Sequence, residues 1–155
     1  MKPLLAALAL TTALTLPGLA LARPVTLTTT LNAYGGDGAY LAYYVTDDTG
    51  AYVGSLWMAG GKSKYYEHLS DWYAATGGDP AQINGITGAS VGAGRDLEIT
   101  LDLADALFDA GYTLHVDAAV EDMRDSPNEI AVPLTSAGLG RAVPGRRYIA
   151  SLTYR

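Results

Sequence analysis

The chain has 155 residues, which is enough for one domain with a sizeable core and requires no second domain. It contains no cysteine, so disulfides, thiolate catalysis and iron–sulfur ligation are excluded. Its net charge of -6 disfavours nucleic acid and anionic lipid as partners.

The N-terminal 22 residues have the pattern of an export signal. Lys2 precedes an apolar run without charge up to Arg23, and a proline and a glycine break this run before the small-residue cleavage site Ala20-Leu21-Ala22. Threonines dilute the run, which favours a cleaved signal over a retained membrane anchor. We therefore predict a signal peptide over residues 1–22 and a mature domain over residues 23–155 that does not span a membrane and is periplasmic or secreted.

Alternation of apolar and polar residues predicts strands along most of the mature chain. The run from Val25 to Leu31 alternates with threonines, as in a half-buried strand. The β-rich runs 39–46 and 51–58 flank the turn Asp47-Asp48-Thr49-Gly50, so they predict a hairpin. Further strands are predicted over residues 97–101, 112–118, 130–134 and 148–154.

One segment has the periodicity of a helix instead. Its expected apolar face consists of Tyr65, Leu69, Trp72 and Tyr73. Ser63 is the expected N-cap, and the glycines after Thr76 end the helix. Adjacent helical residues cannot both face inward, so either Tyr65 or Tyr66 is left to stack on a ligand or to contact a partner.

About seven strands, all antiparallel, and one short inserted helix predict a mainly β fold. We expect an immunoglobulin-like antiparallel β-sandwich rather than a barrel. Residues 81–94 carry four glycines and little charge, which predicts an ordered surface loop held by Ile83, Ile86 and Val91. Residues 136–147 are predicted to form another loop.

The loop 81–94 contains the one stretch whose residue types match a specific chemical need, Asn84-Gly85-Ile86-Thr87-Gly88-Ala89-Ser90. A hydroxyl that another enzyme is to modify needs an exposed loop with small neighbours, and Gly88 and Ala89 give Ser90 such neighbours. The stretch resembles the covalent flavin attachment motif Asp-x-x-Ser/Thr-Gly-Ala-Ser/Thr of the FMN-bearing subunits of the sodium-pumping quinone reductase and related electron-transport complexes.

This resemblance implies that a periplasmic flavin transferase joins the phosphate of FMN to the last hydroxyl of the motif. The acceptor is then Ser90, and Thr87, Gly88 and Ala89 form the recognition core. Asn84 stands where the motif usually has Asp, and Ser90 stands where Thr is commoner. The alternative interpretation is a glycine-rich turn without modification.

The order of elements is similar to that of domain-of-unknown-function family 2271, a group of predicted periplasmic proteins. The elements that carry the resemblance are Tyr40 with its strand, the turn Asp48-Thr49-Gly50, the helix with Leu69 and Trp72, the stretch Thr87-Gly88-Ala89-Ser90, and Gly111-Tyr112-Thr113-Leu114. The resemblance covers nearly the whole mature chain. It implies an immunoglobulin-like sandwich and an association with membrane redox proteins and flavin transferases.

The histidines and the acidic residues predict no specific functional site of their own. His68 is expected on the helix, either as a partly exposed residue or, if the loop of Ser90 lies near, as a contact to a flavin or its phosphate. Neither His68 nor His115 has metal-ligand spacing, and the acidic residues lack the pattern of a calcium loop, so we predict no metal site. The residues around Ser90 also lack the register of a hydrolase Gly-x-Ser-x-Gly motif.

The leading hypothesis is an exported redox-accessory domain that carries FMN on Ser90 and exchanges electrons with a membrane redox partner. The alternative is a non-catalytic binding or scaffold domain that docks on a membrane protein through a sheet edge or a tyrosine-rich face. An independent enzyme has the least support, because the sequence offers no acid–base dyad and no metal set.

Overall fold

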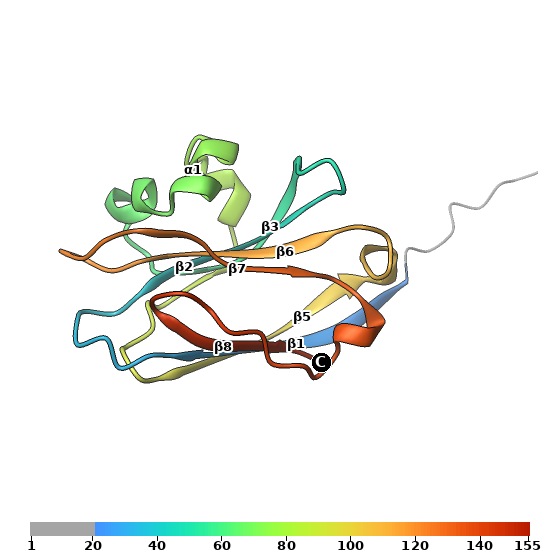
Figure 1. The fold of residues 1–155 in the computed structure, drawn as a ribbon. Coiled ribbons are helices and arrows are strands. Elements are labelled where there is room, and N and C mark those ends of the chain that lie inside the picture. Colours follow the sequence, from blue (N-terminus) through green and yellow to red (C-terminus); the bar gives the residue numbers. More distant parts are fainter. Residues whose placement is uncertain (1–20) are drawn as a thin grey trace, which may run out of the picture.

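The computed structural model describes residues 21–155, so the predicted signal peptide, apart from Leu21 and Ala22, lies outside the described residues. The described chain is mainly β and forms two stacked sheets, which confirms the predicted β-sandwich (Figure 1). The immunoglobulin-like assignment stays a prediction.

The smaller sheet has three strands in the order β5-β1-β8. Its members are β1 (Ala22–Leu31), β5 (Asp96–Ala104) and β8 (Ile149–Tyr154). β1 is antiparallel to both neighbours. Along β1 the apolar residues point into the sandwich and the threonines mostly point out, as the alternating pattern predicts.

The larger sheet has five strands in the order β4-β3-β2-β6-β7. Its members are β2 (Tyr40–Thr46), β3 (Tyr52–Ala59), β4 (Thr87–Gly88), β6 (Thr113–Ala119) and β7 (Ser126–Pro133). The predicted hairpin of β2 and β3 is confirmed. The expectation that all strands are antiparallel is wrong for β4, which pairs parallel with β3. The chain crosses over through the helical segment before β4, and such a crossover permits the parallel direction.

The main core lies between the two sheets. Leu27 from β1, Leu41 from β2 and Leu114 from β6 are completely buried there. The hydroxyls of Thr29 and Tyr43 hydrogen-bond to each other at 2.8 Å across the core, so this polar pair links the two sheets. Burial raises the pKa of Tyr43, which keeps the phenol neutral.

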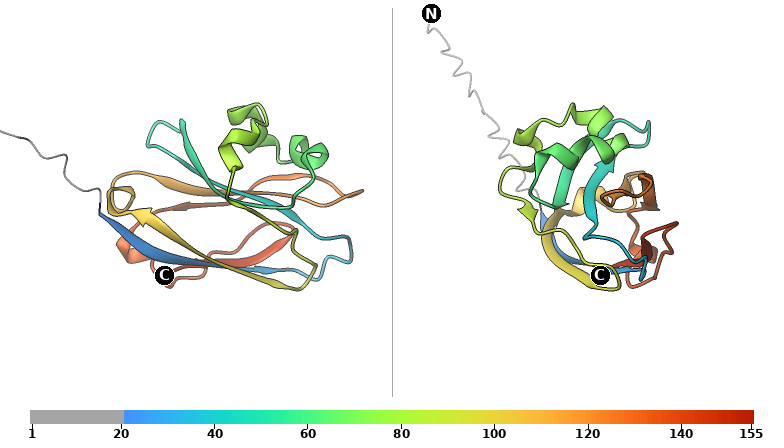
Figure 2. Two further views of the ribbon diagram at one scale, coloured as in Figure 1. Left: turned by 180° about the vertical axis from the view of Figure 1, so that it is seen from behind. Right: turned by 90° about the vertical axis from the view of Figure 1, so that its left-hand side faces the viewer.

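A layer of short helices covers the outer face of the larger sheet (Figures 1 and 2). It consists of η1 (Ser63–His68), α1 (Ser70–Thr76) and η2 (Pro80–Ile83), where η marks a 3₁₀ helix. Two further 3₁₀ turns, η3 (Asp105–Leu107) and η4 (Ser136–Gly138), lie in connections elsewhere. Trp72 is completely buried under this layer, against Tyr44 and Met58 of the sheet. β2 is therefore buried on both faces.

The prediction of one continuous helix is wrong. The chain forms the 3₁₀ helix η1, breaks at Leu69 (φ -85°, ψ 67°) and then forms α1. Because a 3₁₀ helix has three residues per turn, Tyr66 and Leu69 share the buried face, and Tyr65 does not. Tyr73, expected on the apolar face, is 39% exposed.

Of the two predicted ends of the helix, the N-terminal cap is wrong and the C-terminal end is confirmed. Ser63 is not the N-cap, because η1 begins after Lys62 and no side chain caps it. The expected end at Thr76 is confirmed, and Gly77 follows it with φ 66°, a left-handed conformation that suits glycine.

The two predicted loops are ordered by different means. Ile83 and Val91 are buried and Ile86 is partly buried, so these residues hold the loop 81–94 as expected. The loop also contains β4 and most of η2, which its sequence did not reveal. The loop 136–147 contains η4 and a bridge from Val143 to Leu152 of β8.

Candidate functional site

Ser90 lies on an exposed two-residue segment between two fixed points. On one side, the carbonyl of Gly88 in β4 accepts a hydrogen bond from the backbone N–H of Gly60 at 2.8 Å. On the other side, Val91 and Ala39 exchange backbone hydrogen bonds of 2.7 and 3.0 Å. Ala89 and Ser90 between them are both exposed. The backbone therefore presents the Ser90 hydroxyl to solvent from a fixed position.

Close packing explains why small residues surround this segment. A Cβ atom added at Gly88 would lie 2.7 Å from Cζ2 of Trp57. Any larger residue at position 88 would therefore clash with the Trp57 ring. A Cβ atom added at Gly38 would lie 2.8 Å from Oγ of Ser90. The glycines thus allow the backbone to approach Trp57 and Ser90 closely, a structural reason that is independent of any modification.

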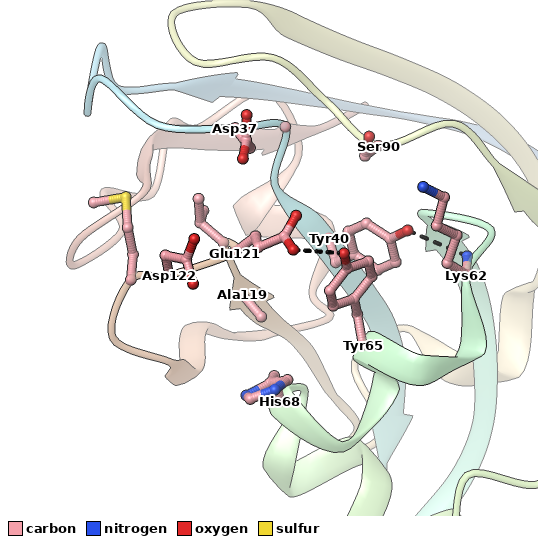
Figure 3. A pocket seen from close by; sticks show the side chains of 12 residues that line it. Asp37, Tyr40, Lys62, Tyr65, His68, Ser90, Ala119, Glu121 and Asp122 are labelled. Carbon is pink, nitrogen blue, oxygen red and sulfur yellow. Dashed lines mark hydrogen bonds between the residues drawn. The ribbon is translucent and has the colours of Figure 1, made fainter.

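Ser90 lines a pocket of about 450 Å³ at one end of the sandwich (Figure 3). The pocket lies between the segment that enters β2, the helix η1, the end of β6 and the turn after it. Its lining residues are Asp37, Gly38, Tyr40, Lys62, Tyr65, His68, Ser90, Ala119, Val120, Glu121, Asp122 and Met123. Residues far apart in the sequence therefore form one site.

Two tyrosines form an aromatic wall in the pocket. The rings of Tyr40 and Tyr65 lie 5.2 Å apart at 70°, an edge-to-face arrangement. The Tyr65 hydroxyl donates to Glu121 Oε1 at 2.7 Å, and the Tyr40 hydroxyl accepts from the Lys62 backbone N–H at 3.2 Å. Tyr66 instead is buried and donates to the carbonyl of Gly60. The sequence predicted that one of the two tyrosines 65 and 66 would not face inward, and this residue is Tyr65.

The pocket has two electrostatic halves. Figure 3 shows the Lys62 side chain on the same side as Ser90, whereas Glu121 and Asp122 lie on the other side of the tyrosines. Lys62 is exposed and belongs to none of the ion pairs in the described part of the chain. An anionic group on Ser90 would therefore have a cation nearby.

His68 lines the same pocket as Ser90, on the far side from it (Figure 3). Its Nδ1 lies 3.1 Å from both carboxylate oxygens of Asp125, and its side chain is 49% exposed. The pair fixes the orientation of the imidazole ring. The structure thus brings His68 and Ser90 to one cavity, and a contact between His68 and a flavin stays a prediction.

The other motif residues do not line this pocket. Asn84 is exposed at the end of η2, and Thr87 donates its hydroxyl to the carbonyl of Ile83 at 2.9 Å. Thr87 and Gly88 form β4, and Ala89 lines a shallow depression beside Trp57. Of the residues predicted to bind a cofactor, only Ser90 and His68 meet in the pocket.

His115, the other histidine, lies on β6 at a different site. Its ring stacks on Tyr44 with the centroids 5.1 Å apart, and its nitrogens lie 2.9 Å from Thr46 Oγ1 and 2.8 Å from Asn128 Oδ1. It serves as a packing and hydrogen-bonding residue. Between residues 21 and 155, no three His, Asp or Glu side chains are grouped so that they could hold a metal ion.

Sequence reasoning missed two buried carboxylates, Asp117 and Glu129, which are 0% and 2% exposed. Asp117 accepts hydrogen bonds from the backbone N–H groups of Trp72 and Asn128, at 2.7 and 2.8 Å, and so holds α1 on the sheet. No sequence signal distinguishes Asp117 from an exposed strand residue, because the helical layer that buries it comes from elsewhere in the chain. For Glu129, the apolar residues that follow it in β7 were the only hint.

The fold and this pocket define a two-sheet β-sandwich with an exposed hydroxyl at the mouth of an aromatic cavity. The chain belongs to the family described as predicted periplasmic protein (DUF2271), whose model matches residues 22–151. The family description confirms the predicted periplasmic location. Neither the curated proteins nor the solved structures gave a match. None of the helices formed by residues 21–155 is both long and apolar enough to cross a membrane.

Proposed function

We propose that this protein is a periplasmic redox-accessory domain that carries FMN covalently on Ser90 and exchanges electrons with a membrane redox partner. The observation that carries the proposal is the position of Ser90. Its hydroxyl is exposed on a segment fixed at both ends and opens onto a pocket with an aromatic wall. The resemblance of residues 84–90 to a flavin attachment motif supplies the identity of the group.

The attachment is a transfer of FMN from FAD by a flavin transferase. The Ser90 oxygen attacks the FMN phosphorus of FAD, a new P–O ester bond forms, and the pyrophosphate P–O bond breaks. AMP leaves, and the proton of the serine hydroxyl passes to a base of the transferase or to solvent. An exposed segment without bulky neighbours suits this reaction, because the hydroxyl must enter the active site of another enzyme.

The residues of the pocket fit the attached group. Its volume of about 450 Å³ lies within the range of cofactor sites. A phosphodiester on Ser90 would have Lys62 on its side of the pocket, and the rings of Tyr40 and Tyr65 would offer faces and edges to the isoalloxazine. Glu121 and Asp122 face the opposite half, where ribityl hydroxyls and the ring N–H can donate hydrogen bonds.

Bound FMN supplies one- and two-electron chemistry, and the protein supplies the position. The chain's own residues tether the group, exclude part of the solvent and leave one side open to a partner. A covalent tether suits an exported protein because a freely bound cofactor diffuses away. On this proposal the protein is an electron carrier rather than an independent enzyme.

The first test is the intact mass of the protein after export from cells that also produce a flavin transferase. We expect a mass increase of one esterified FMN in the wild type and none in Ser90→Ala. Ser63→Ala is the matched control, because Ser63 is also exposed and outside the motif. An unshifted wild-type mass in the presence of an active transferase contradicts the proposal.

A second test probes the pocket rather than the attachment. Tyr65→Ala leaves Ser90 untouched, so we expect full flavin attachment but a lower fluorescence anisotropy of the flavin, because the ring has lost a stacking surface. Tyr73→Ala, which removes an exposed tyrosine outside the pocket, is the control and is expected to leave the anisotropy unchanged. Equal anisotropy in wild type and Tyr65→Ala argues against flavin binding in the pocket.

The alternative function, a non-catalytic domain that docks on a membrane protein, is favoured by one other observation. β4 pairs with β3 at Met58 and Ala59, and no strand formed by residues 21–155 pairs with the rest of the outer edge of β3. Val53 on this part of β3 is 51% exposed. An unpaired edge can accept a strand from a partner. A protein that stays unflavinylated but loses its membrane partner when Val53 is replaced by lysine would support this alternative.

A further inference from the structure

A second cleft at the same end of the sandwich concentrates positive charge. Its volume is about 610 Å³, and it lies between the start of β7 and the segment that leads into β8. The residues that line it are Arg124, Asp125, Ser126, Pro127, Arg146 and Arg147. The whole chain has 10 basic and 16 acidic residues, so three arginines in one cleft stand out against an acidic molecule.

Buried groups hold the three arginines together. Oε1 of Glu129 accepts hydrogen bonds from the backbone N–H groups of Arg146 and Arg147, at 2.9 and 2.6 Å. The Tyr148 hydroxyl donates to the carbonyl of Arg124. The Tyr148 hydroxyl and the Arg124 carbonyl are 24 residues apart in the sequence, so this bond fastens two distant segments to each other beneath the cleft. This backbone arrangement brings the three arginines to one cleft.

The guanidinium groups of this arginine cleft have no carboxylate partner. The ion pairs among residues 21–155 involve Arg23, His68 and Arg155, and none involves an arginine of the cleft. Asp125, the one acid in the cleft, is already bonded to His68. Three exposed cations that line one cleft repel one another, and a bound anion offsets this repulsion.

The arginine cleft suits carboxylates better than a single phosphate. Protein sites for phosphate are commonly built from backbone N–H groups, but those of Arg146 and Arg147 are occupied by Glu129. These two N–H groups are therefore not free to bind a phosphate, whereas the three arginine side chains are exposed. The cleft is also open and far larger than one phosphate group, and Pro127 adds an apolar surface to it. These features match an extended ligand with several negative charges.

We propose that the arginine cleft binds an acidic segment of a protein partner. The acidic remainder of the molecule repels such a segment, so the cleft also fixes the orientation in which the partner docks. Asp125 of the cleft is bonded to His68 of the pocket that holds Ser90, so the partner lies next to that pocket. The proposal does not depend on the modification of Ser90.

The test uses octaglutamate as the probe and the exported protein at low ionic strength, followed by amide NMR spectra. We expect shifts confined to residues 124–127 and 145–148, and weaker binding as salt is added. The variant R124Q/R146Q/R147Q should bind about tenfold more weakly, since three exposed ion pairs of a few tenths of a kcal/mol each are lost. Its thermal midpoint is expected to match the wild type, because the backbone bonds to Glu129 do not involve the guanidinium groups.

The matched control is R95Q/R141Q/R155Q, which removes the same charge from three exposed arginines outside the cleft. We expect its affinity for octaglutamate to stay within twofold of the wild type. Equal weakening in both triple variants would show a general charge effect and overturn the proposal. Binding of pyrophosphate, or of phosphatidylglycerol vesicles, that octaglutamate cannot displace would overturn it as well.

Discussion

The two buried carboxylates Asp117 and Glu129 differ in their hydrogen-bond donors. Neither has a cationic partner in the described part of the chain, and each fastens one segment to the larger sheet. Burial raises the pKa of Asp117 above its ordinary 3.8, and hydrogen bonds from Asn128 and Trp72 offset this only in part. For Glu129, burial also acts to raise the pKa, but hydrogen bonds from Ile149, Ser126 and neighbouring amides outweigh it and lower the pKa below 4.5.

The two carboxylates differ in the number of donors that stabilise their charged form, and the charge of Asp71 raises the pKa of Asp117 further. Asp117 accepts two backbone N–H bonds and a longer bond of 3.3 Å from Tyr44. Glu129 accepts from four consecutive backbone N–H groups, those of residues 146–149, and from Ser126. The larger set of donors goes with the lowered pKa of Glu129, and the smaller set goes with the raised pKa of Asp117.

The largest expected effect comes from Glu129→Ala. The N–H groups of Tyr148 and Ile149 are buried and lose their acceptor, which should lower the free energy of unfolding by about 3 kcal/mol or more. Urea unfolding monitored by circular dichroism measures this loss. Glu98→Ala, at an exposed position on β5, is the control and should change stability by less than about 0.5 kcal/mol. A loss below about 1 kcal/mol in Glu129→Ala would show that water replaces the carboxylate.

Asp117→Asn should have the next largest effect. The amide nitrogen cannot accept from the Trp72 N–H, so α1 loses its anchor at a cost of about 2 kcal/mol. Hydrogen exchange should accelerate in α1 more than in β1. The control Asp102→Asn, on the exposed face of β5, should leave both stability and exchange unchanged. Uniform acceleration over the whole chain would mean that Asp117 supports the sandwich and not the helix alone.

The pH dependence of stability should have opposite signs for the two groups. Because the folded-state pKa of Glu129 is lowered, its contribution is complete above pH 4.5 and is lost as the pH falls through that lowered pKa. Because the folded-state pKa of Asp117 is raised, the folded protein gains stability as the pH falls from that raised pKa toward 3.8. Each contribution changes by at most about 1.4 kcal/mol per pH unit.

Urea titrations between pH 3 and pH 6 test these signs with Glu129→Gln and Asp117→Asn. Relative to the wild type, Glu129→Gln should flatten the loss of stability on acidification, and Asp117→Asn should steepen it. Parallel curves for the two variants would contradict the contrast between the sites.

The smallest effect is expected for Ser126→Ala. The hydroxyl of Ser126 donates to Oε2 of Glu129, so its removal should cost about 1 kcal/mol and bring the pKa of Glu129 closer to its ordinary value. The acid transition should then begin at a higher pH than in the wild type. Ser151→Ala on β8 is a control at a partly exposed serine of the other sheet. An unchanged acid transition would show that the backbone N–H groups alone set the pKa of Glu129.

Most of the fold could be predicted from strand periodicity in the sequence. The short strand β4 and the break in the helical segment could not. β1, β2 and β3 were predictable because their alternating and β-branched residues face one core or two. β4 was not, because it has two residues and its pairing depends on where the helical layer returns the chain. The break at Leu69 was also missed, since no glycine or proline marks it and 3₁₀ turns are frequent at the ends of α-helices.

The same division holds for the candidate site. Ser90 was singled out by its small neighbours, and one of them, Gly88, does pack tightly against Trp57, while Ser90 itself packs against Gly38. The residues that share its pocket, Tyr65, His68 and Glu121, come from other elements and could not be assigned to one cavity from their spacing in the sequence. The arginine cleft was missed because hydrogen bonds between distant segments bring Arg124 and Arg146 together. Glu129 accepts from the Arg146 N–H, and the Tyr148 hydroxyl donates to the Arg124 carbonyl.

The sequence by itself determined an acidic, cysteine-free, β-rich chain with an export signal pattern and a small-residue loop around one serine, because composition and short-range periodicity are local properties. Only the tertiary structure decided which side chains share the pocket, which carboxylates are buried and where the positive charge gathers. These properties depend on contacts between residues far apart in the chain, and the free energy of such contacts is set by the packing of the whole sandwich.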